Sequence, residues 1–356
     1  MTFLKNNRII LLTLIVLGCF ILNQYSRTSL GGIHYVRNFF LPYQQFRNRI
    51  FNLIPFSIGD VIYLILLLLI FYWVIKGIIM VFHKKYTKKD FVENFSIGIT
   101  VFCVMYFVFF FSWGANYNKE SILPEEVAKK IEWNDDYLKQ MLGATITDLN
   151  HYQKGTIREE KLDNIRTQLK QTYQSYLGEQ TPDVYAKRSL FSGAVAYMGI
   201  QGYYNPFTGE AMISEKIPNF MWGFVTAHEM AHQLGVAVEG EANFLAYVIC
   251  MQSQDSTIHY SGKLNLFLYA YRELFDKDST VANQYFNQLN TYNKDNILEL
   301  RRMRKLYKGR INEISNEWYN KFLKNQGQDK GLESYREISK WVYNWERFGE
   351  IKPNVY

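Results

Sequence analysis

Three long apolar stretches dominate the first third of the chain and restrict what it can fold into. Residues 61–75 contain no charged side chain, and weaker runs cover 9–22 and 95–113. About 20 consecutive apolar residues span the hydrocarbon core of a bilayer as a helix, and each Leu, Ile or Val favours insertion. The sequence therefore predicts three transmembrane helices, at about 9–24, 58–82 and 95–115.

The link between the first two predicted spans has a helical repeat of its own. Apolar side chains recur there every three to four residues, at Val36, Phe39, Phe40, Tyr43, Phe46, Ile50 and Ile54. This spacing is typical of an amphipathic helix that lies on a membrane surface. We expect an interfacial helix near 36–54, with Arg37, Arg47 and Arg49 facing anionic headgroups.

Basic residues indicate an orientation in the membrane. Lys84, Lys85, Lys88 and Lys89 lie between the second and third predicted spans, and Lys5 and Arg8 precede the first. Cytoplasmic loops carry such an excess of Lys and Arg, although the arginines of the first link would favour the opposite orientation. We expect a multi-pass cell-membrane protein with a cytoplasmic N-terminus, a membrane domain at 1–117 and an extracytoplasmic domain at 118–356.

Charge and cysteine content exclude two other classes of protein. The net charge of +7 is compatible with nucleic-acid binding, but no recognition motif accompanies it, so a surface facing anionic lipid or cell wall explains it better. Cys19 and Cys103 fall in predicted spans and Cys250 in a predicted buried helix, which excludes a disulfide framework. We therefore expect a lipid bilayer as a partner and no nucleic acid.

The predicted extracytoplasmic domain is mostly helical, with a small sheet. Residues 124–177 indicate two or three amphipathic helices, and helices are also expected within 264–274, 281–289, 297–307 and 335–345. Between 184 and 214, short apolar pieces alternate with glycines and predict strands at Ser189–Phe191, Ala194–Met198 and Ala211–Ile213. The fold class is α+β. The region 197–213 is either a plain hairpin or a strand to which an extended peptide can add.

The motif His228-Glu-Met-Ala-His232 carries the most specific chemistry. On a helix, His228 and His232 lie at i and i+4, so both imidazoles leave one face and can hold one metal ion. Glu229 can then take a proton from a metal-activated water. The flanking residues are apolar, and a buried His or Glu is costly without a partner, which favours a bound metal over a plain surface helix.

The next segment supplies candidates for a third ligand. Gly235 can end the helix, and Glu239 or Glu241 opens the following one. Glu239 is preferred because Asn243, at i+4, could orient a ligating histidine, whereas the residue four beyond Glu241 is a leucine. A His2Glu site predicts one Zn²⁺ per chain, although such a site binds other divalent ions as well.

At these residues the sequence resembles the zincin metallopeptidases, and specifically the gluzincins, whose second helix carries Glu-x-x-Ala-Asp or a close relative. Glu239-Gly-Glu-Ala-Asn243 is similar to that pattern, with Asn in place of Asp. The glutamate follows the second histidine more closely than in most gluzincins, and Val238 stands where a metzincin has its third histidine. The resemblance implies a zincin-like domain and excludes a true metzincin.

More widely, the chain resembles a little-characterised family of bacterial polytopic membrane proteins grouped with the zincins. The segments that carry this resemblance, besides the zinc segments, are Trp113–Tyr117, Tyr204–Ala211, Tyr260–Gly262 and Gly331–Tyr335. Zincins often use a His or Tyr from a helical C-terminal part to stabilise the oxyanion. The candidates here are Tyr260, His259, Tyr319 and Tyr335, of which Tyr335 is preferred.

The sequence thus favours a membrane-anchored zinc endopeptidase that hydrolyses peptides or proteins outside the cytoplasm. The alternatives are a non-catalytic sensor or interaction protein that retains a zincin site, and a structural protein in which zinc joins two helices. An intact Glu229 argues against the first alternative, and the lack of a nearby thiol argues against the second. No apolar run of about 20 residues surrounds the motif, so the site is expected in water or at the membrane face.

Overall fold

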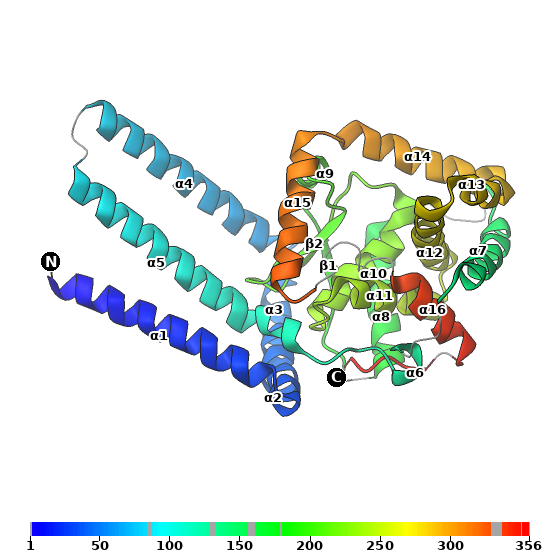
Figure 1. Ribbon diagram of the computed structural model, residues 1–356, viewed down its shortest axis with the longest axis horizontal. Helices are drawn as coiled ribbons and strands as arrows, with labels where there is room; N and C mark the ends of the chain where they lie inside the picture. The colour runs from blue at the N-terminus through cyan, green and yellow to red at the C-terminus, as the bar shows by residue number, and fades with distance from the viewer. Residues whose placement is uncertain are drawn as a thin grey trace.

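The computed structural model describes residues 2–83, 87–128, 133–155, 161–178, 180–328, 337–349 and 351–355. Within this part of the chain, three helices are long and apolar enough to cross a membrane, as the sequence predicts. They are α1 (Thr2–Ser26), α4 (Ile58–Phe82) and α5 (Lys88–Ser112), and they extend together from a mostly helical domain (Figure 1). Lys84 and Lys85, which contribute to the predicted orientation, lie outside the described residues.

Local hydrogen bonds set the ends of the long helices. α4 begins where the Ser57 hydroxyl accepts a hydrogen bond from the Asp60 N–H (3.0 Å). α5 begins at Lys88, earlier than the predicted 95, because Thr87 and Asp90 form a reciprocal capping box. It ends at Ser112, before the predicted 115, because Trp113 leaves the helical conformation (φ −157°, ψ −39°).

The link between α1 and α4 is helical, as predicted, but part of its polar side is buried, while Arg37 and Arg49 are exposed. It comprises α2 (Ser29–His34), the π-helix η1 (Tyr35–Phe40) and α3 (Leu41–Phe51). The prediction that Arg47 faces lipid headgroups is wrong: its side chain is buried and donates to the Pro206 carbonyl (2.7 Å). This face of α3 docks on the domain, where the Pro206 carbonyl and the side-chain oxygens of Gln44 and Tyr204 accept hydrogen bonds from the two terminal nitrogens of the guanidinium.

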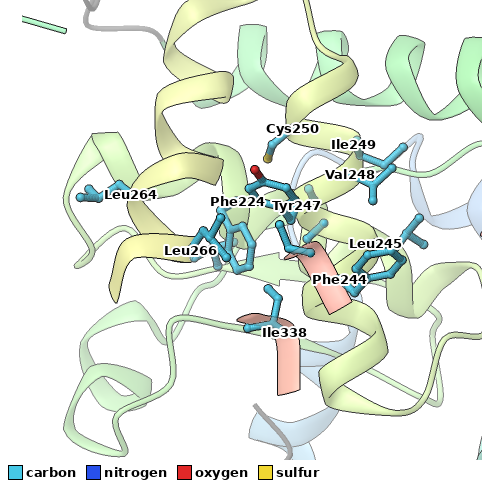
Figure 2. Close-up of a cluster of buried hydrophobic side chains, with 14 of the residues drawn as sticks. Phe224, Phe244, Leu245, Tyr247, Val248, Ile249, Cys250, Leu264, Leu266 and Ile338 are labelled. Carbon is cyan, nitrogen blue, oxygen red and sulfur yellow. The ribbon is translucent and has the colours of Figure 1, made fainter. Parts of the chain in front are cut away.

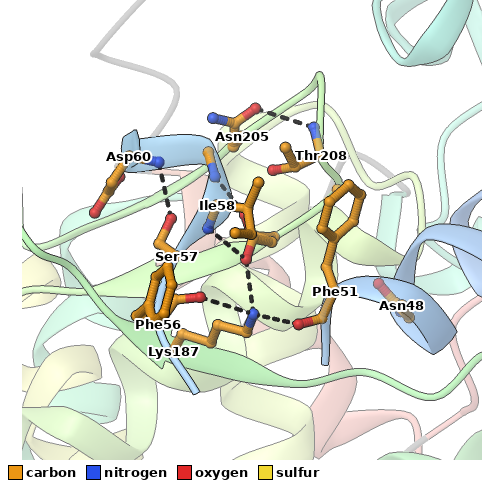
Figure 3. A network of polar contacts seen from close by, with 12 residues as sticks. Asn48, Phe51, Phe56, Ser57, Ile58, Asp60, Lys187, Asn205 and Thr208 are labelled. Carbon is orange, nitrogen blue, oxygen red and sulfur yellow. Dashed lines mark hydrogen bonds and ion pairs between the residues drawn. The ribbon is translucent and has the colours of Figure 1, made fainter. Parts of the chain in front are cut away.

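A buried ion pair fastens α4 to the domain (Figure 3). Lys187 Nζ lies 2.7 Å from Glu210 Oε1 and donates to the carbonyls of Phe51 (2.6 Å) and Phe56 (3.2 Å). The same carboxylate accepts the first free N–H groups of α4, including that of Gly59 (2.7 Å). A negative charge at a helix N-terminus is favourable, so the pair anchors the first turn of this apolar helix to the domain.

The domain packs around a core formed by α10, α11, α12 and α16 (Figure 2). The core is made of almost completely buried side chains from these helices: Phe224, Phe244, Tyr247, Leu266 and Ile338.

The elements of the domain, in chain order, are η2 (Gly114–Asn118), α6 (Glu125–Ala128), α7 (Asp135–Asn150), α8 (Leu162–Leu177), β1 (Ala186–Arg188), α9 (Ser192–Tyr197), β2 (Gly202–Tyr204), β3 (Ala211–Ile213), η3 (Asn219–Met221), α10 (Trp222–Gln233), α11 (Glu239–Gln252), α12 (Ser256–Lys277), α13 (Ser279–Gln288), α14 (Thr291–Tyr307), α15 (Arg310–Asn325) and α16 (Ile338–Arg347).

The small sheet has the order β1-β3-β2. β1 is parallel to β3, and β2 is antiparallel to it with Tyr203 opposite Met212, so β2 is an edge strand. The predicted strand at Ala211–Ile213 is confirmed as β3, but the one at Ala194–Met198 is wrong, because that segment is helix α9. A short run rich in alanine can form either structure, and Gly199 (φ 80°) ends the helix. The piece at Ser189–Phe191 lies just beyond β1.

Candidate metal centre

A tight turn joins the two helices that carry the motif. α10 follows Pro218 and η3 and ends at Gln233, and α11 begins at Glu239. Gly235 adopts φ 79° in the turn, which a residue with a side chain rarely does. A Cβ there would also lie 2.9 Å from the ring of Phe40 and 3.0 Å from Asn116 Oδ1. The turn thus needs glycine both for its conformation and for the close approach of η1 and η2.

The structure brings His228, His232 and Glu239 together. Each offers one ligand atom, and these atoms all lie within 4.8 Å of one another. Glu239 Oε2 is 3.2 Å from His228 Nε2 and 3.7 Å from His232 Nε2. Two atoms that each bind one zinc ion at about 2.0–2.1 Å in tetrahedral geometry lie about 3.3 Å apart. The three side chains therefore fit a divalent metal with small adjustments.

Neighbouring groups hold these side chains in place. His232 Nδ1 lies 2.7 Å from the Val236 carbonyl, which fixes the proton on Nδ1 and leaves Nε2 free to bind a metal. Tyr319 donates a short hydrogen bond to Glu239 Oε1, the oxygen that does not face the histidines. Asn243 Oδ1 accepts a hydrogen bond from the Tyr269 hydroxyl (3.3 Å), and neither its amide nitrogen nor His228 Nδ1 has a hydrogen-bond partner among the residues that the structure describes. Its predicted role in orienting a histidine therefore stays a prediction.

Glu229 is buried next to the three candidate ligands. Its Oε2 has no hydrogen-bond partner among the residues that the structure describes. A Cβ on Gly202 would lie 2.7 Å from both Cγ and Oε1 of Glu229, so strand β2 passes directly against this carboxylate. Burial, aided by the nearby charge of Glu239, raises the pKa of Glu229 to about 8, and His228 partly opposes the shift. A carboxylate with a raised pKa is suited to accept and return a proton near neutral pH.

The charges of His232 and Glu239 suit metal binding. Burial lowers the pKa of His232 to about 4, so this ring is neutral and its Nε2 lone pair is available. Burial also lowers the pKa of His228, but the hydrogen bond that this ring donates to Glu239 and the charge of Glu229 more than offset it, so metal binding would displace a proton from His228. Burial alone would raise the pKa of Glu239, whereas His232, His228 and Tyr319 together bring it to about 2, so Glu239 is ionised.

Several predicted site residues lie elsewhere. Glu241, the alternative ligand, points away and accepts a hydrogen bond from the Ile122 N–H (3.2 Å). Tyr260 is buried in the core and donates to Asn293 (3.0 Å). His259, in the first turn of α12, contacts the Tyr152 hydroxyl (3.3 Å). Tyr335, the preferred oxyanion residue, lies outside the described residues. Of the four candidates, Tyr319 is the one that the structure places at the motif.

Strand β2 presents a free edge to the site. The Ser214 N–H donates to the Gln201 carbonyl (2.9 Å), and the Asn205 N–H donates to the Glu210 carbonyl (2.8 Å). Because hydrogen-bonded pairs alternate along antiparallel strands, residues 201, 203 and 205 face β3. The intervening Gly202 and Tyr204 therefore direct their backbone N–H and C=O groups away from the sheet. An extended peptide could add along this edge.

These groups open into a cleft of about 1380 Å³. Its walls include β2, the motif residues, the end of α5 and one face of α15. Sequence reasoning assigned no role to Trp113 or Tyr204, yet Trp113 packs on both the His232 ring (6.0 Å between centroids) and the Tyr204 ring (5.3 Å). One sequence signal was present: both residues begin segments through which the chain resembles the polytopic membrane family.

Comparison with known proteins finds one family. A family model described as "Protein of unknown function (DUF3810)" matches residues 35–343, a range that includes α4, α5, the sheet and the whole motif. No curated protein and no solved structure matches the chain.

Proposed function

The chain belongs to the family described as proteins of unknown function (DUF3810), and for this member we propose a zinc-dependent endopeptidase anchored in the cell membrane. The observation that carries the proposal is the group of His228, His232 and Glu239 with Glu229 beside it. Catalytic zinc sites use three protein ligands of this kind and keep one position open, whereas structural sites close with four. The residues that the structure describes include no fourth His, Cys, Asp or Glu in the group.

The chain's own residues supply the proton transfers that hydrolysis needs. A zinc ion held by His228, His232 and Glu239 would lower the pKa of a bound water toward about 7 and polarise the scissile carbonyl. Glu229 accepts a proton from the attacking water and then donates it to the amine nitrogen as the C–N bond breaks. Its raised pKa and its buried oxygen suit both steps. Tyr319 keeps Glu239 in position from the opposite side.

The substrate's main chain has a place beside these groups. Gly202 and Tyr204 offer backbone donors and acceptors on the free edge of β2. Gly202 also brings this edge against Glu229, so a peptide added there would pass its backbone close to the general base. Backbone pairing binds peptides with little dependence on their side chains. This arrangement supports an endopeptidase that hydrolyses a peptide or protein chain.

The location of the site follows from charge. Lys5, Arg8, Lys88 and Lys89 flank the spans on one side of the membrane, and the positive-inside rule makes that side cytoplasmic. The domain after α5 then faces the outside of the cell.

The test combines metal analysis with a cleavage assay. Full-length protein is purified in detergent as wild type, His232→Ala and Glu229→Gln, and the zinc content of each is measured. We expect about one zinc per chain in wild type and Glu229→Gln, and a loss of most zinc in His232→Ala. A mixture of unstructured peptides is then incubated with each protein, and new termini are identified by mass spectrometry.

Wild-type protein should cleave peptides, and Glu229→Gln should be slower by at least about 100-fold, since general acid–base catalysis contributes about 10²–10⁴. Zinc binding without any Glu229-dependent cleavage would favour the non-catalytic sensor instead. A wild-type protein that cannot be loaded with zinc or another divalent ion would overturn the proposal.

A further inference from the structure

We propose that the cleft receives the segment of a membrane-anchored polypeptide that directly adjoins the bilayer. This inference rests on the proposed peptidase function and specifies its substrate class. Three observations carry it. They are the short path from an apolar helix to the candidate ligands, an apolar face of α15 along the cleft that is exposed among the described residues, and the contact between that face and the apolar helix.

The end of α5 lies very close to the candidate ligands. Phe109, in the last turn of this span, lines the cleft and packs on Trp113 with ring centroids 6.4 Å apart. Trp113 in turn packs on His232 at 6.0 Å. Two ring contacts therefore connect a helix that is apolar enough to cross the membrane with a metal ligand. The site stands at the membrane face, where a peptide leaving the bilayer reaches it within a few residues.

The wall formed by α15 is apolar and open. Ile311, Ile314 and Trp318 recur at helical spacing on the face that lines the cleft, and they are 61%, 46% and 71% exposed. Leu323 is the one residue of α15 that is fully buried. A contiguous exposed apolar face of this kind marks an interaction site, because leaving it in water is unfavourable.

The same helix continues the apolar surface of the membrane helix. Phe322 of α15 packs on Phe109 (6.3 Å between ring centroids) and on Tyr117 (6.2 Å). Figure 1 shows α15 on the side of the domain from which α4 and α5 extend. One turn before Phe322, Tyr319 contacts Glu239. An apolar path thus runs from the span to the candidate ligands without a break.

These features select a polypeptide as the occupant. The free edge of β2 offers backbone hydrogen bonds, which a peptide main chain can use and a lipid tail cannot. A polar peptide from bulk water would leave the apolar face of α15 uncovered. A segment that directly adjoins the bilayer has apolar side chains that can pack on α15 and a main chain that can form hydrogen bonds with β2.

The experiment compares two synthetic peptides with full-length, zinc-loaded protein in lipid nanodiscs. The first has a Leu/Ala span of about 20 residues followed at once by a fluorogenic tail. The second has a flexible polar linker of about 30 residues between the same span and the same tail. Both are confined to the bilayer equally, so only the distance of the tail from the membrane differs. We expect the first to be cut about tenfold faster, close to its span.

Two variants test the wall itself. Ile314→Gln/Trp318→Gln should lower the cleavage rate of the span-adjacent peptide by about tenfold, since each buried apolar side chain contributes to binding. Leu298→Gln, an exposed leucine of α14 outside the cleft, is the matched control and should keep the wild-type rate. Equal cleavage of the two peptides, or equal rates in the two variants, would overturn the inference while leaving the peptidase function intact.

A binding measurement separates this inference from the peptidase function. In Glu229→Gln protein, a photoreactive residue placed at Ile311 is irradiated with each peptide, so no hydrolysis is required. Preferential crosslinking of the span-adjacent peptide supports the inference even where no cleavage is found. Equal or absent crosslinking of both peptides overturns it.

Discussion

Tyr319 and Glu239 are joined by a short hydrogen bond across the cleft, although they come from α15 and from the first residue of α11. The Tyr319 hydroxyl donates to Oε1 of the Glu239 carboxylate, and Oε2 lies 3.2 Å from His228 Nε2. The tyrosine therefore fixes the rotation of a candidate metal ligand from a helix that is otherwise largely exposed. Through this hydrogen bond, α15, which forms the apolar wall of the cleft, contacts the candidate metal centre directly.

Tyr319→Phe should weaken metal binding without abolishing it. Outer hydrogen-bond partners of metal ligands typically contribute about 10–100-fold to affinity. We expect the Kd for Zn²⁺, measured by competition with a chromophoric chelator, to rise within that range while the stoichiometry stays at one. Tyr307→Phe is a control on the neighbouring helix. An unchanged affinity in Tyr319→Phe would show that this hydroxyl does not support the ligand.

Glu239→Gln and Glu241→Gln should differ sharply in metal content. Glu239 faces both histidines, whereas Glu241 accepts a hydrogen bond from the Ile122 backbone. A neutral amide is a much poorer metal ligand than a carboxylate, so Glu239→Gln should lose most bound zinc and Glu241→Gln should retain it. Elemental analysis of the purified proteins decides this. The reverse result would exchange the roles of the two glutamates.

Gly202→Ala should impair catalysis and spare metal binding. The added Cβ would lie 2.7 Å from Glu229 Cγ and Oε1 and 2.9 Å from the Met212 carbonyl, so the general base or the strand must shift. A displacement of about 1 Å can cost on the order of 10²-fold in rate. Gly143→Ala, where no atom lies within 4 Å, serves as the control. We expect a large loss of peptidase rate in Gly202→Ala with unchanged zinc content.

Lys187→Met should destabilise the domain strongly, because it leaves the Glu210 carboxylate buried without its cation. Breaking a buried pair in this way costs about 3–5 kcal/mol. The exposed pair of Lys321 and Glu317 offers a control, since water screens this pair and Lys321→Met should cost far less stability. Thermal unfolding in detergent should show a much larger drop for Lys187→Met. The variant that carries both Lys187→Met and Glu210→Gln should lose less stability than the summed losses of the two single variants, because the partners are coupled.

The stability contributed by Lys119 should depend on pH. Burial lowers the pKa of Lys119 to about 8, with Glu241 partly opposing the shift. An unfolded lysine has a pKa of about 10.4, so between about pH 8 and 10 the unfolded chain binds more protons than the folded one. Stability then rises with pH, and the cost of the buried charge is fully present below about pH 8. Unfolding temperatures of wild type relative to Lys119→Met should therefore rise from pH 8 to 10, and a flat difference would contradict this.

The fold could be predicted from the sequence where a local pattern alone determines structure. The uncharged run at 61–75 marks α4 because no tertiary contact is needed to make a span of apolar residues insert. His228 and His232 share a helix face because i and i+4 always do. The predicted strand at Ala194–Met198 was wrong, because a short apolar run fits a strand and a helix equally well.

Some features of the candidate site could likewise be predicted from local sequence, and others depend on tertiary packing. The sequence by itself determined that the two histidines share a helix face with Glu229 next to them, and that three helices are apolar enough to cross a membrane, because each depends on spacing or composition within one segment. Only the tertiary structure shows that Glu239, and not Glu241, lies beside the histidines, because that placement depends on how the turn at Gly235 directs the next helix. It also decided that Tyr319 reaches the site, because that contact joins segments far apart in the chain, and packing rather than local periodicity brings them together.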